Sequence, residues 1–317
     1  MSNRGLLSFV IITYRNFDGI IDTLNSVFEQ DYPRIQLVFS DDGSANYYDE
    51  IVKIKEYIKQ NKTNNIEDVV YSHLEENQGT VKNINNAVSL AKGEYIKMLG
   101  GGDVLSTPAA LTKYVDFLEN SDYTIVFSKL IGVTEDGEYI EHLASCEEDY
   151  DMLRLMNSEE LCNKLFVRNF LPAPAWCCKK ELFERNGLYD ESIRLIEDYP
   201  YWIKLCQNEE KIGFIDDVLI DYKLDGVSST GSYGINFMND MFLIYQKWIF
   251  PYDKRYKMIQ PIYNKLKLMG LETYMSKAKW KNMNKMEKIM SYLKYWPFFL
   301  YIDINDMRIK LKNQKSK

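Results

Sequence analysis

The stretch LLSFVIIT, Leu6 to Thr13, is a continuous apolar run of the kind found in strands buried on both faces of a parallel sheet. After it, apolar residues recur at helical spacing over about residues 18–30, which predicts a helix. The alternation continues, with strands predicted at 35–40, 69–74, 94–99 and 123–129 and helices at 47–60, 80–91 and from 107. Strands alternating with helices favour an open, mostly parallel α/β sheet, in which ligands bind beyond the carboxyl ends of the strands.

The second half of the chain is less regular. The pattern predicts an acidic loop and a helix over 146–163, a short strand and a helix over 172–187, and a helix from near Glu197. Residues 211–224 predict two short strands, and from 236 the pattern is helical to near the end. We therefore expect a main domain over 1–235, with halves 1–130 and 131–235, and a helical C-terminal region over 236–317.

Composition limits the class of protein. With 317 residues, 46% of them apolar, the chain is long enough for one large or two small globular domains. The five cysteines lack the paired spacing of a zinc site, and two histidines argue against a histidine-rich metal site. Apolar runs are too short for a transmembrane helix or a signal peptide, so we expect a cytosolic protein with reduced thiols.

The net charge of −7 hides an asymmetry along the chain. From Lys247 onward there are 17 Lys and Arg against 5 Asp and Glu, which leaves 22 against 41 before it. Over 274–296, apolar residues recur at helical spacing among lysines, as in a helix that lies on an anionic membrane surface. The alternative is a helix that packs its apolar stripe on the body of the protein. Nucleic-acid binding has only the charge in its favour, because no recognisable motif is present.

Polar residues follow three of the predicted strands. TYRN (13–16) follows the first strand, DDGS (41–44) the second, and three glycines with Asp103 the fourth. Carboxylates gathered at one sheet edge repel each other unless something binds there, and a uracil N–H or a divalent metal with a diphosphate would suit them. Taken singly, DDGS is an ordinary turn and Asp103 a charge at a helix start. Their order on successive strands makes a binding site the more specific interpretation.

Longer runs around these motifs resemble a known family. SFVIITYRN, SVFEQDYPRIQLVFSDDGS and ENQGTVKNINNAVSLAKGEYIKMLGGGDVLSTPAAL are similar to the N-terminal half of the family 2 inverting glycosyltransferases, which have the GT-A fold. The resemblance covers roughly Leu6 to Leu130, and IEDYPYWIKL, which resembles the family's acidic ED motif, extends it to about Tyr222. It implies a Rossmann-like mixed, mainly parallel sheet flanked by helices, and a nucleotide-sugar donor.

The resemblance also implies site residues. Asp42 would hold the base and Lys82 would contact phosphate, although Ile84 stands where the family often has an arginine. For catalysis it implies Asp198 as the general base, with Glu197 before it. The implied donor-binding residues are Thr13, Tyr14, Asp41, Asp42, Asn77, Gly79, Lys82, Gly101, Gly102 and Asp103.

The metal motif departs from the family pattern. Members usually read D-x-D or x-D-D here, whereas Gly100 and Gly102 replace the upstream acids and leave Asp103. The last aspartate is the one expected to touch Mn²⁺ or Mg²⁺, and the glycines would let the backbone approach the diphosphate closely. A metal-independent enzyme and an inactive relative are the two other interpretations.

One carboxylate suffices as the general base of a single displacement, which inverts the anomeric centre. Asp198 is the candidate, because it stands at a predicted helix start where free amides and the dipole stabilise a carboxylate. Helix capping is the alternative role of the ED pair. Trp176 either lines the acceptor site or belongs to the core.

These observations predict an inverting glycosyltransferase that moves a hexosyl or N-acetylhexosaminyl group from a UDP-sugar to a hydroxyl of a saccharide acceptor. The resemblance points to a lipid-linked acceptor in bacterial capsular or other surface polysaccharide synthesis, with the protein at the inner face of the membrane. The alternative is a catalytically weak nucleotide-sugar-binding relative that serves as a partner or scaffold for another transferase. No nucleic-acid partner is expected, and the sequence does not specify an oligomeric state.

Overall fold

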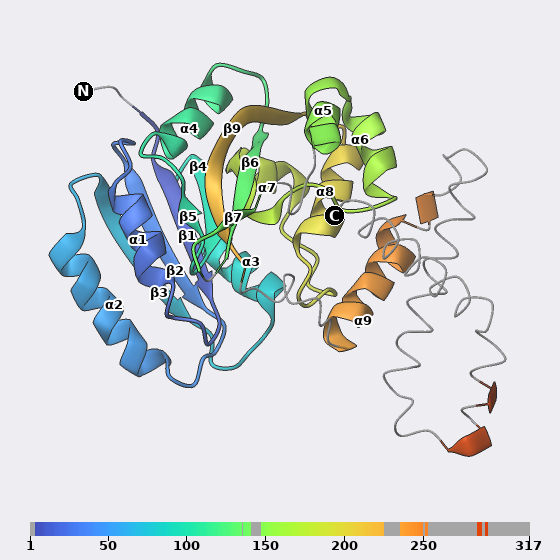
Figure 1. The fold of residues 1–317 in the computed structure, drawn as a ribbon, viewed down its shortest axis with the longest axis horizontal. Coiled ribbons are helices and arrows are strands. Elements are labelled where there is room, and N and C mark those ends of the chain that lie inside the picture. The colour runs from blue at the N-terminus through green and yellow to red at the C-terminus, as the bar shows by residue number, and fades with distance from the viewer. Residues whose placement is uncertain are drawn as a thin grey trace. The chain divides into compact units, whose positions relative to one another are not determined.

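The apolar run near the N-terminus forms strand β1 (Leu7–Thr13), which pairs on both sides within the sheet. The computed structural model describes residues 4–134, 136–140, 147–224, 235–249, 251–252, 284–286 and 289–290 (Figure 1). The chain divides into two compact units, residues 1–232 and 233–317.

The first unit is built on one mixed sheet. Its strand order is β3-β2-β1-β4-β8-β6-β9-β5, with β7 paired to β6. Strands β3, β2, β1 and β4 are mutually parallel, and β8 is antiparallel to both β4 and β6. The mixed, mainly parallel sheet of the sequence prediction is therefore confirmed. The remaining strands are β2 (Ile35–Asp41), β3 (Ile66–His73), β4 (Tyr95–Gly100), β5 (Val104–Leu105), β6 (Ile125–Val133), β7 (Tyr139–Ile140), β8 (Trp176–Lys179) and β9 (Ile212–Lys223).

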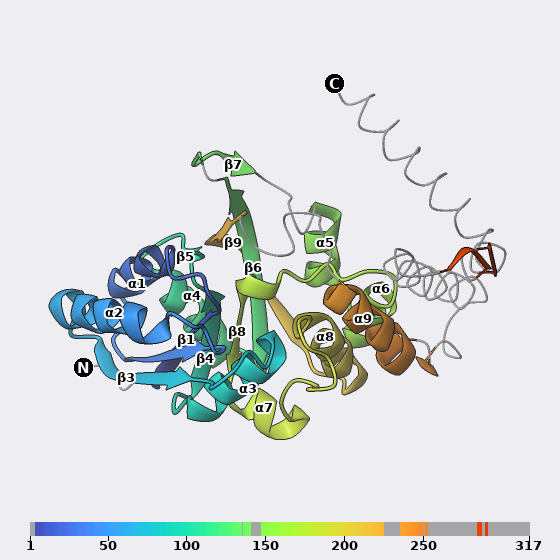
Figure 2. The same ribbon diagram turned by 90° about the horizontal axis from the view of Figure 1, so that it is seen from below.

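Helices cover both faces of this sheet, as the view from below in Figure 2 shows. Helices α1, α2 and α4 lie over one face and α3 and α7 over the other (Figure 2). Each turns a stripe of buried apolar residues to the sheet, as in α2, where Tyr47, Ile51, Ile54 and Ile58 are buried. The helices are α1 (Ile20–Phe28), α2 (Tyr47–Asn61), α3 (Thr80–Leu90), α4 (Ala110–Glu119), α5 (Glu147–Leu155), α6 (Ser158–Leu165), α7 (Glu181–Asn186) and α8 (Asp198–Gln207), with a 3₁₀ turn at Ala173–Ala175.

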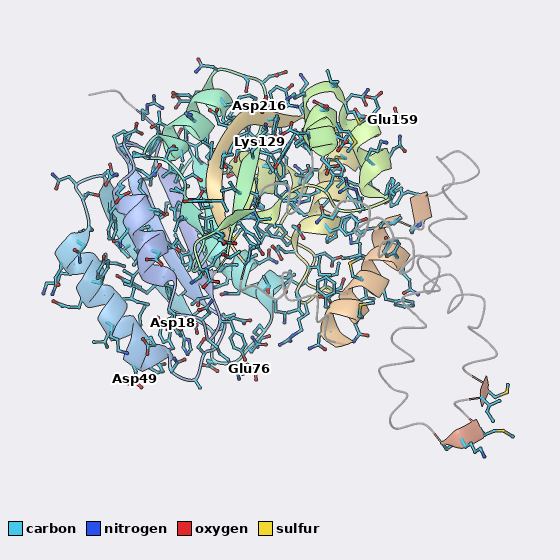
Figure 3. All side chains as sticks on the ribbon, in the orientation of Figure 1. Asp18, Asp49, Glu76, Lys129, Glu159 and Asp216 are labelled. Atoms are coloured by element: carbon cyan, nitrogen blue, oxygen red, sulfur yellow. The ribbon has the colours of Figure 1, made fainter. Side chains whose placement is uncertain are left out.

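Strand β9 differs from the prediction. The sequence pattern predicts two short strands over 211–224. The structure has one strand of 12 residues, whose register against β6 shifts near Lys129. Asp216 and Asp217 lie at this shift, since Ile215 is opposite Ser128 and Val218 is opposite Lys129. Asp216 pairs with Lys129 at 2.8 Å and Asp217 with Lys113 at 2.7 Å. Figure 3 labels Lys129 and Asp216, which lie beside each other and away from Glu76 in that view.

The segment predicted as an acidic loop and a helix over 146–163 forms two helices, α5 and α6. Asn157 begins α6 with a capping box: its side chain accepts from the Glu160 amide, and the Glu160 carboxylate accepts from the Asn157 amide, both at 3.0 Å. Such reciprocal bonds satisfy amides that a helix start otherwise leaves unpaired, and they fix where the helix begins.

A lysine is completely buried in the sheet. Lys97 on β4 has no exposed surface, and its Nζ donates to the carbonyl oxygens of Pro174 at 2.5 Å and Met98 at 3.0 Å. Burial lowers the pKa of Lys97 from 10.5 to about 7, because the ammonium loses its hydration. The bond to Pro174 ties β4 to the 3₁₀ turn that precedes β8.

This burial predicts how stability depends on pH. Between about pH 7 and 10.5 the unfolded chain holds the Lys97 proton that the folded protein has released, so the stability of the wild type rises with pH relative to a variant without this group. From pH 7 to 9 we expect the free energy of unfolding of the wild type to gain about 2.5 kcal/mol over Lys97→Met. Urea denaturation at pH 7, 8 and 9 measures this. The exposed Lys92→Met is the control, and a constant difference across this range for Lys97→Met would contradict the expectation.

The second unit is described over fewer residues. It contains α9 (Ile235–Ile244), followed by a π-helical turn (Tyr245–Ile249). The predicted membrane-binding helix over 274–296 lies outside the described residues apart from 284–286 and 289–290. Among all described residues, no helix combines the length and apolar character needed to cross a membrane.

Candidate active site

Parallel strands β1, β2 and β4 bring their carboxyl ends to one edge of the sheet. Thr13 at the end of β1 is in register with Asp41 on β2, and Ile12 with Gly100 on β4. The predicted nucleotide residues after β2 and the predicted metal residue after β4 therefore flank the end of β1. This is the placement that the sequence predicted for a ligand site.

The loops after β1 and β2 are tied together by hydrogen bonds. The Asp42 amide donates to the Thr13 carbonyl at 3.0 Å, and the Arg15 amide donates to Ser44 Oγ at 2.7 Å. Ser44 in turn donates its amide and hydroxyl to Asp41, at 2.8 and 2.6 Å. Asp41 is fully buried, so it shapes this loop from beneath. Tyr14 is 37% exposed at the loop surface, where a flat base could stack on it.

Asp42 is held by the loop between β3 and α3. Its Oδ2 accepts from Asn77 Nδ2 at 2.7 Å and from the Gly79 amide at 2.9 Å, and its Oδ1 accepts from the Gln78 amide at 2.7 Å. Burial raises the pKa of Asp42, and the two backbone amides act against that rise. A carboxylate accepts about four hydrogen bonds, so one acceptor position on Oδ1 remains.

Two of the three glycines, Gly101 and Gly102, lie against the start of α1. A Cβ added to Gly19 would lie 2.5 Å from Gly102 Cα, and one added to Gly101 would lie 2.8 Å from Ile20 Cγ1. Gly102 also has φ of +112°, a conformation that favours glycine. At Gly100, by contrast, a Cβ would meet only Asp103 Oδ2, at 3.6 Å. Packing against α1 thus accounts for Gly101 and the positive φ for Gly102, while the close approach to a diphosphate stays a prediction.

Asp103 is held in place from two sides. Its carbonyl accepts from Thr23 Oγ1 at 2.8 Å, and its Oδ1 accepts from the Lys223 amide at 3.0 Å. Within the described residues, no group of three or more His, Cys, Asp or Glu side chains could enclose a metal ion. One carboxylate fits a Mg²⁺ or Mn²⁺ ion that keeps several waters and takes its other ligands from substrate phosphates.

Lys82, the predicted phosphate contact, lies in an acidic environment. Its Nζ donates to Gln78 Oε1 at 3.2 Å on the surface of α3. The cavity beside it, of about 730 Å³, has three glutamates in its wall, which disfavours a diphosphate there. It is lined by Leu74, Glu75, Glu76, Gln78, Lys82, Asn85, Asn86, Leu188 and Glu191.

The predicted general base begins helix α8. Asp198 Oδ2 accepts from Asn169 Nδ2 at 2.7 Å, and the neighbouring Glu197 has no capping hydrogen bond from its side chain. Burial raises the pKa of both carboxyls, and the charge of Asp198 raises that of Glu197 further, whereas Asn169 acts to lower that of Asp198. Of the two, Asp198 is the carboxyl whose charged form accepts a hydrogen bond from a neighbouring side chain, Asn169.

Asn169 is a site residue that the sequence did not indicate. It lies between α6 and the 3₁₀ turn, 29 residues before Asp198, in a stretch with no motif. Trp176, in contrast, is a core residue: it is 3% exposed, with its ring 6.0 Å from that of Trp202 and 6.4 Å from that of Phe183. The core interpretation of Trp176 is thus the one the structure supports.

The chain has polar residues beyond its parallel strands and a carboxylate at the start of a later helix. Together with the mixed sheet, these features are those of the GT-A glycosyltransferases. The chain belongs to glycosyl transferase family 2, whose family profile matches residues 8–186.

Three known proteins illustrate the similarity. Poly-beta-1,6-N-acetyl-D-glucosamine synthase of Staphylococcus epidermidis is 29% identical over 173 residues, which span 52% of this chain and 40% of that protein. TarS 1–349 of S. aureus in complex with UDP-GlcNAc superimposes with a TM-score of 0.57 at 17% identity, over 92% of this chain and 79% of TarS. Mannosyltransferase PcManGT of Pyrobaculum calidifontis, in complex with GDP-Man and Mn²⁺, gives a TM-score of 0.57 at 16% identity, over 100% and 89%.

Proposed function

We propose that the protein transfers a hexosyl or N-acetylhexosaminyl group from a UDP-sugar to a hydroxyl of a saccharide acceptor, with inversion at the anomeric carbon. The observation that carries the proposal is that Asp42 and Asp103 flank the end of β1 while an amide-held carboxylate, Asp198, begins α8. In this arrangement Asp42 would bind the nucleotide and Asp103 the metal, while Asp198, on a different element, would accept a proton.

In the proposed reaction the acceptor oxygen bonds to the anomeric carbon as the bond from that carbon to the diphosphate oxygen breaks. Asp198 takes the proton of the attacking hydroxyl, and Asn169 holds its carboxylate in place through the bond to Oδ2. The diphosphate leaves with the electron pair of the broken bond. A divalent ion on Asp103, Mn²⁺ or Mg²⁺, would supply neutralising charge for that leaving group.

Uridine is the proposed base because of the hydrogen bonds at Asp42. Three donors already occupy its carboxylate, and the position left on Oδ1 matches the single N–H of a uracil ring. Guanine presents two adjacent donor groups, which this carboxylate would satisfy less well. The UDP-GlcNAc complex of TarS supports uridine and the GDP-Man complex of PcManGT represents the competing base.

Surface polysaccharide synthesis on a lipid carrier is the proposed context. The similarity to a poly-N-acetylglucosamine synthase supports a polysaccharide product. The surplus of Lys and Arg from Lys247 onward supports attraction to an anionic membrane surface, and hence a peripheral position at the inner face of the membrane. In this proposal residues 1–235 form the transferase domain and 236–317 the membrane-directed region.

Nucleotide binding tests the proposal directly. We expect UDP and UDP-sugars to raise the melting temperature of the wild type in the presence of Mn²⁺, because a ligand that binds only the folded state stabilises it. The panel is UDP, UDP-GlcNAc, UDP-glucose, GDP and GDP-mannose, each with Mn²⁺ or with EDTA. A response to GDP alone would reverse the proposed base, and no response to any nucleotide would contradict the transferase proposal. Binding without release of UDP in the presence of saccharide acceptors would favour the alternative of a catalytically weak partner or scaffold.

A further inference from the structure

Arg194 connects the segment before the predicted general base to the loop that holds Asp42. Its Nη2 donates to the Asn77 carbonyl oxygen at 2.9 Å and also to Asn77 Oδ1. In the other direction, the Val81 amide donates to the Arg194 carbonyl at 3.2 Å. Side chain and backbone of one residue thus hold both sides of the turn into α3.

The turn itself is shaped to receive this arginine. Gly79 has φ of +98°, and a Cβ added there would lie 2.6 Å from the Arg194 carbonyl oxygen. The two segments therefore touch at backbone level, which only glycine permits. Such a contact requires a fixed relative position of residues 77–81 and 193–196.

The side chain of Asn77 lies between Arg194 and Asp42 and bonds to both. Its Nδ2 donates to Asp42 Oδ2 at 2.7 Å, so its Oδ1 is turned toward the guanidinium of Arg194. Both bonds come from Nη2, so one terminal nitrogen of the guanidinium binds the carbonyl oxygen and the side-chain oxygen of Asn77. The positive charge of Arg194 also favours the ionised form of Asp42, against the effect of burial.

At the other end, the same segment leads into helix α8. Ile193 and Ile196, on either side of Arg194, are 1% and 8% exposed and fix the segment in the core. Asp198 follows Ile196 by two residues, so only residues 195–197 separate Arg194 from the predicted general base. Residues 193–198 thus join the predicted base-recognition carboxylate to the predicted general base.

We propose that Arg194 is a positioning residue that sets the orientation of Asp42 through Asn77 and, through residues 195–197, the placement of Asp198. This inference rests on the proposed function for the roles of the two carboxylates. Arg194 need not touch the substrate, because its role is to keep the positions of Asp42 and Asp198 fixed relative to each other. Loss of Arg194 should therefore impair both binding and turnover.

The test compares Arg194→Ala and Arg194→Lys with the wild type and with Arg185→Ala. Arg185 pairs with Glu210 at 2.7 Å and has a half-exposed guanidinium. Arg185→Ala therefore also removes one arginine charge, but outside the proposed site. In Arg194→Ala we expect a tenfold weaker Kd for UDP with Mn²⁺ and a tenfold or larger loss in kcat. Arg194→Lys should lie between, because it keeps the charge but lacks the Nη2 group that binds Asn77, and Arg185→Ala should match the wild type.

Amide hydrogen exchange without ligand separates this inference from the proposed function. Removal of Arg194 should speed exchange in both 77–81 and 193–198, with the Val81 amide included, whether or not the protein binds nucleotides. Faster exchange in both segments in a protein that binds no nucleotide would uphold the positioning role and overturn the transferase proposal. Unchanged exchange at 77–81, or an Arg194→Ala variant with wild-type Kd and kcat, would overturn the positioning role.

Discussion

Asp198→Asn should lower the rate of sugar transfer about 1,000-fold, because an amide cannot accept the proton of the attacking hydroxyl. Binding of UDP should stay within about twofold of the wild type, since no described contact joins Asp198 to the loops around Asp42 and Asp103. Initial rates of UDP release with a saccharide acceptor, measured beside the Kd for UDP, give both quantities.

The same substitution should leave the fold intact. Burial raises the pKa of Asp198 in the folded state, so the folded protein binds this proton more tightly than the unfolded chain does, and ionisation at neutral pH reduces stability. The asparagine variant avoids that cost and should be at least as stable as the wild type at pH 7. Glu197→Gln is the matched control and should cost less than tenfold in rate. Equal losses for the two variants, or an Asp198→Asn enzyme with a tenth of wild-type activity, would reject Asp198 as the base.

Asp103→Asn should remove the part of nucleotide binding that depends on Mn²⁺. The melting temperature of the wild type with UDP should be higher in Mn²⁺ than in EDTA, whereas that of the variant should be the same in both. The rate of sugar transfer should fall about 100-fold, because stabilisation of the leaving group is lost. The exposed Asp22→Asn on α1 is the control for loss of one carboxylate.

Gly100→Asp provides the converse experiment at the same metal motif. The Cβ at this position has room, since its nearest neighbour outside the adjacent residues is Asp103 Oδ2 at 3.6 Å. A second carboxylate should strengthen Mn²⁺ binding severalfold, seen as a lower Mn²⁺ concentration at half-maximal stabilisation by UDP. A Mn²⁺ response retained by Asp103→Asn and unchanged in Gly100→Asp would mean that this sheet edge works without metal.

The outline of the first unit was predictable because its strands are continuous apolar runs and its helices keep a clear period. The ends of β1, β2 and β4 could therefore be located to within a residue or two, and with them Thr13, Asp42 and Asp103. The prediction of two short strands was wrong at Asp216 and Asp217, where one strand continues through a shift in its register against β6.

Residues that act through long-range contacts were beyond sequence reasoning. Asn169 meets Asp198 across 29 residues, and Arg194 meets Asn77 across 117, and neither lies in a recognisable motif. The packing of Gly101 against α1 could not be predicted for the same reason, since it depends on how closely the helix approaches that residue. Apolar periodicity determines which faces are buried, but it does not determine which polar groups meet across them.

The position of β8 has a consequence for how the chain folds during its synthesis. This strand is inserted antiparallel between β4 and β6, although it follows both in the sequence. Until residues 176–179 leave the ribosome, the edge of β4 stays unpaired, and apolar edges of this kind invite association with other chains. A nascent or truncated chain that ends before Trp176 would contain every predicted nucleotide contact and still lack the strand that closes its sheet.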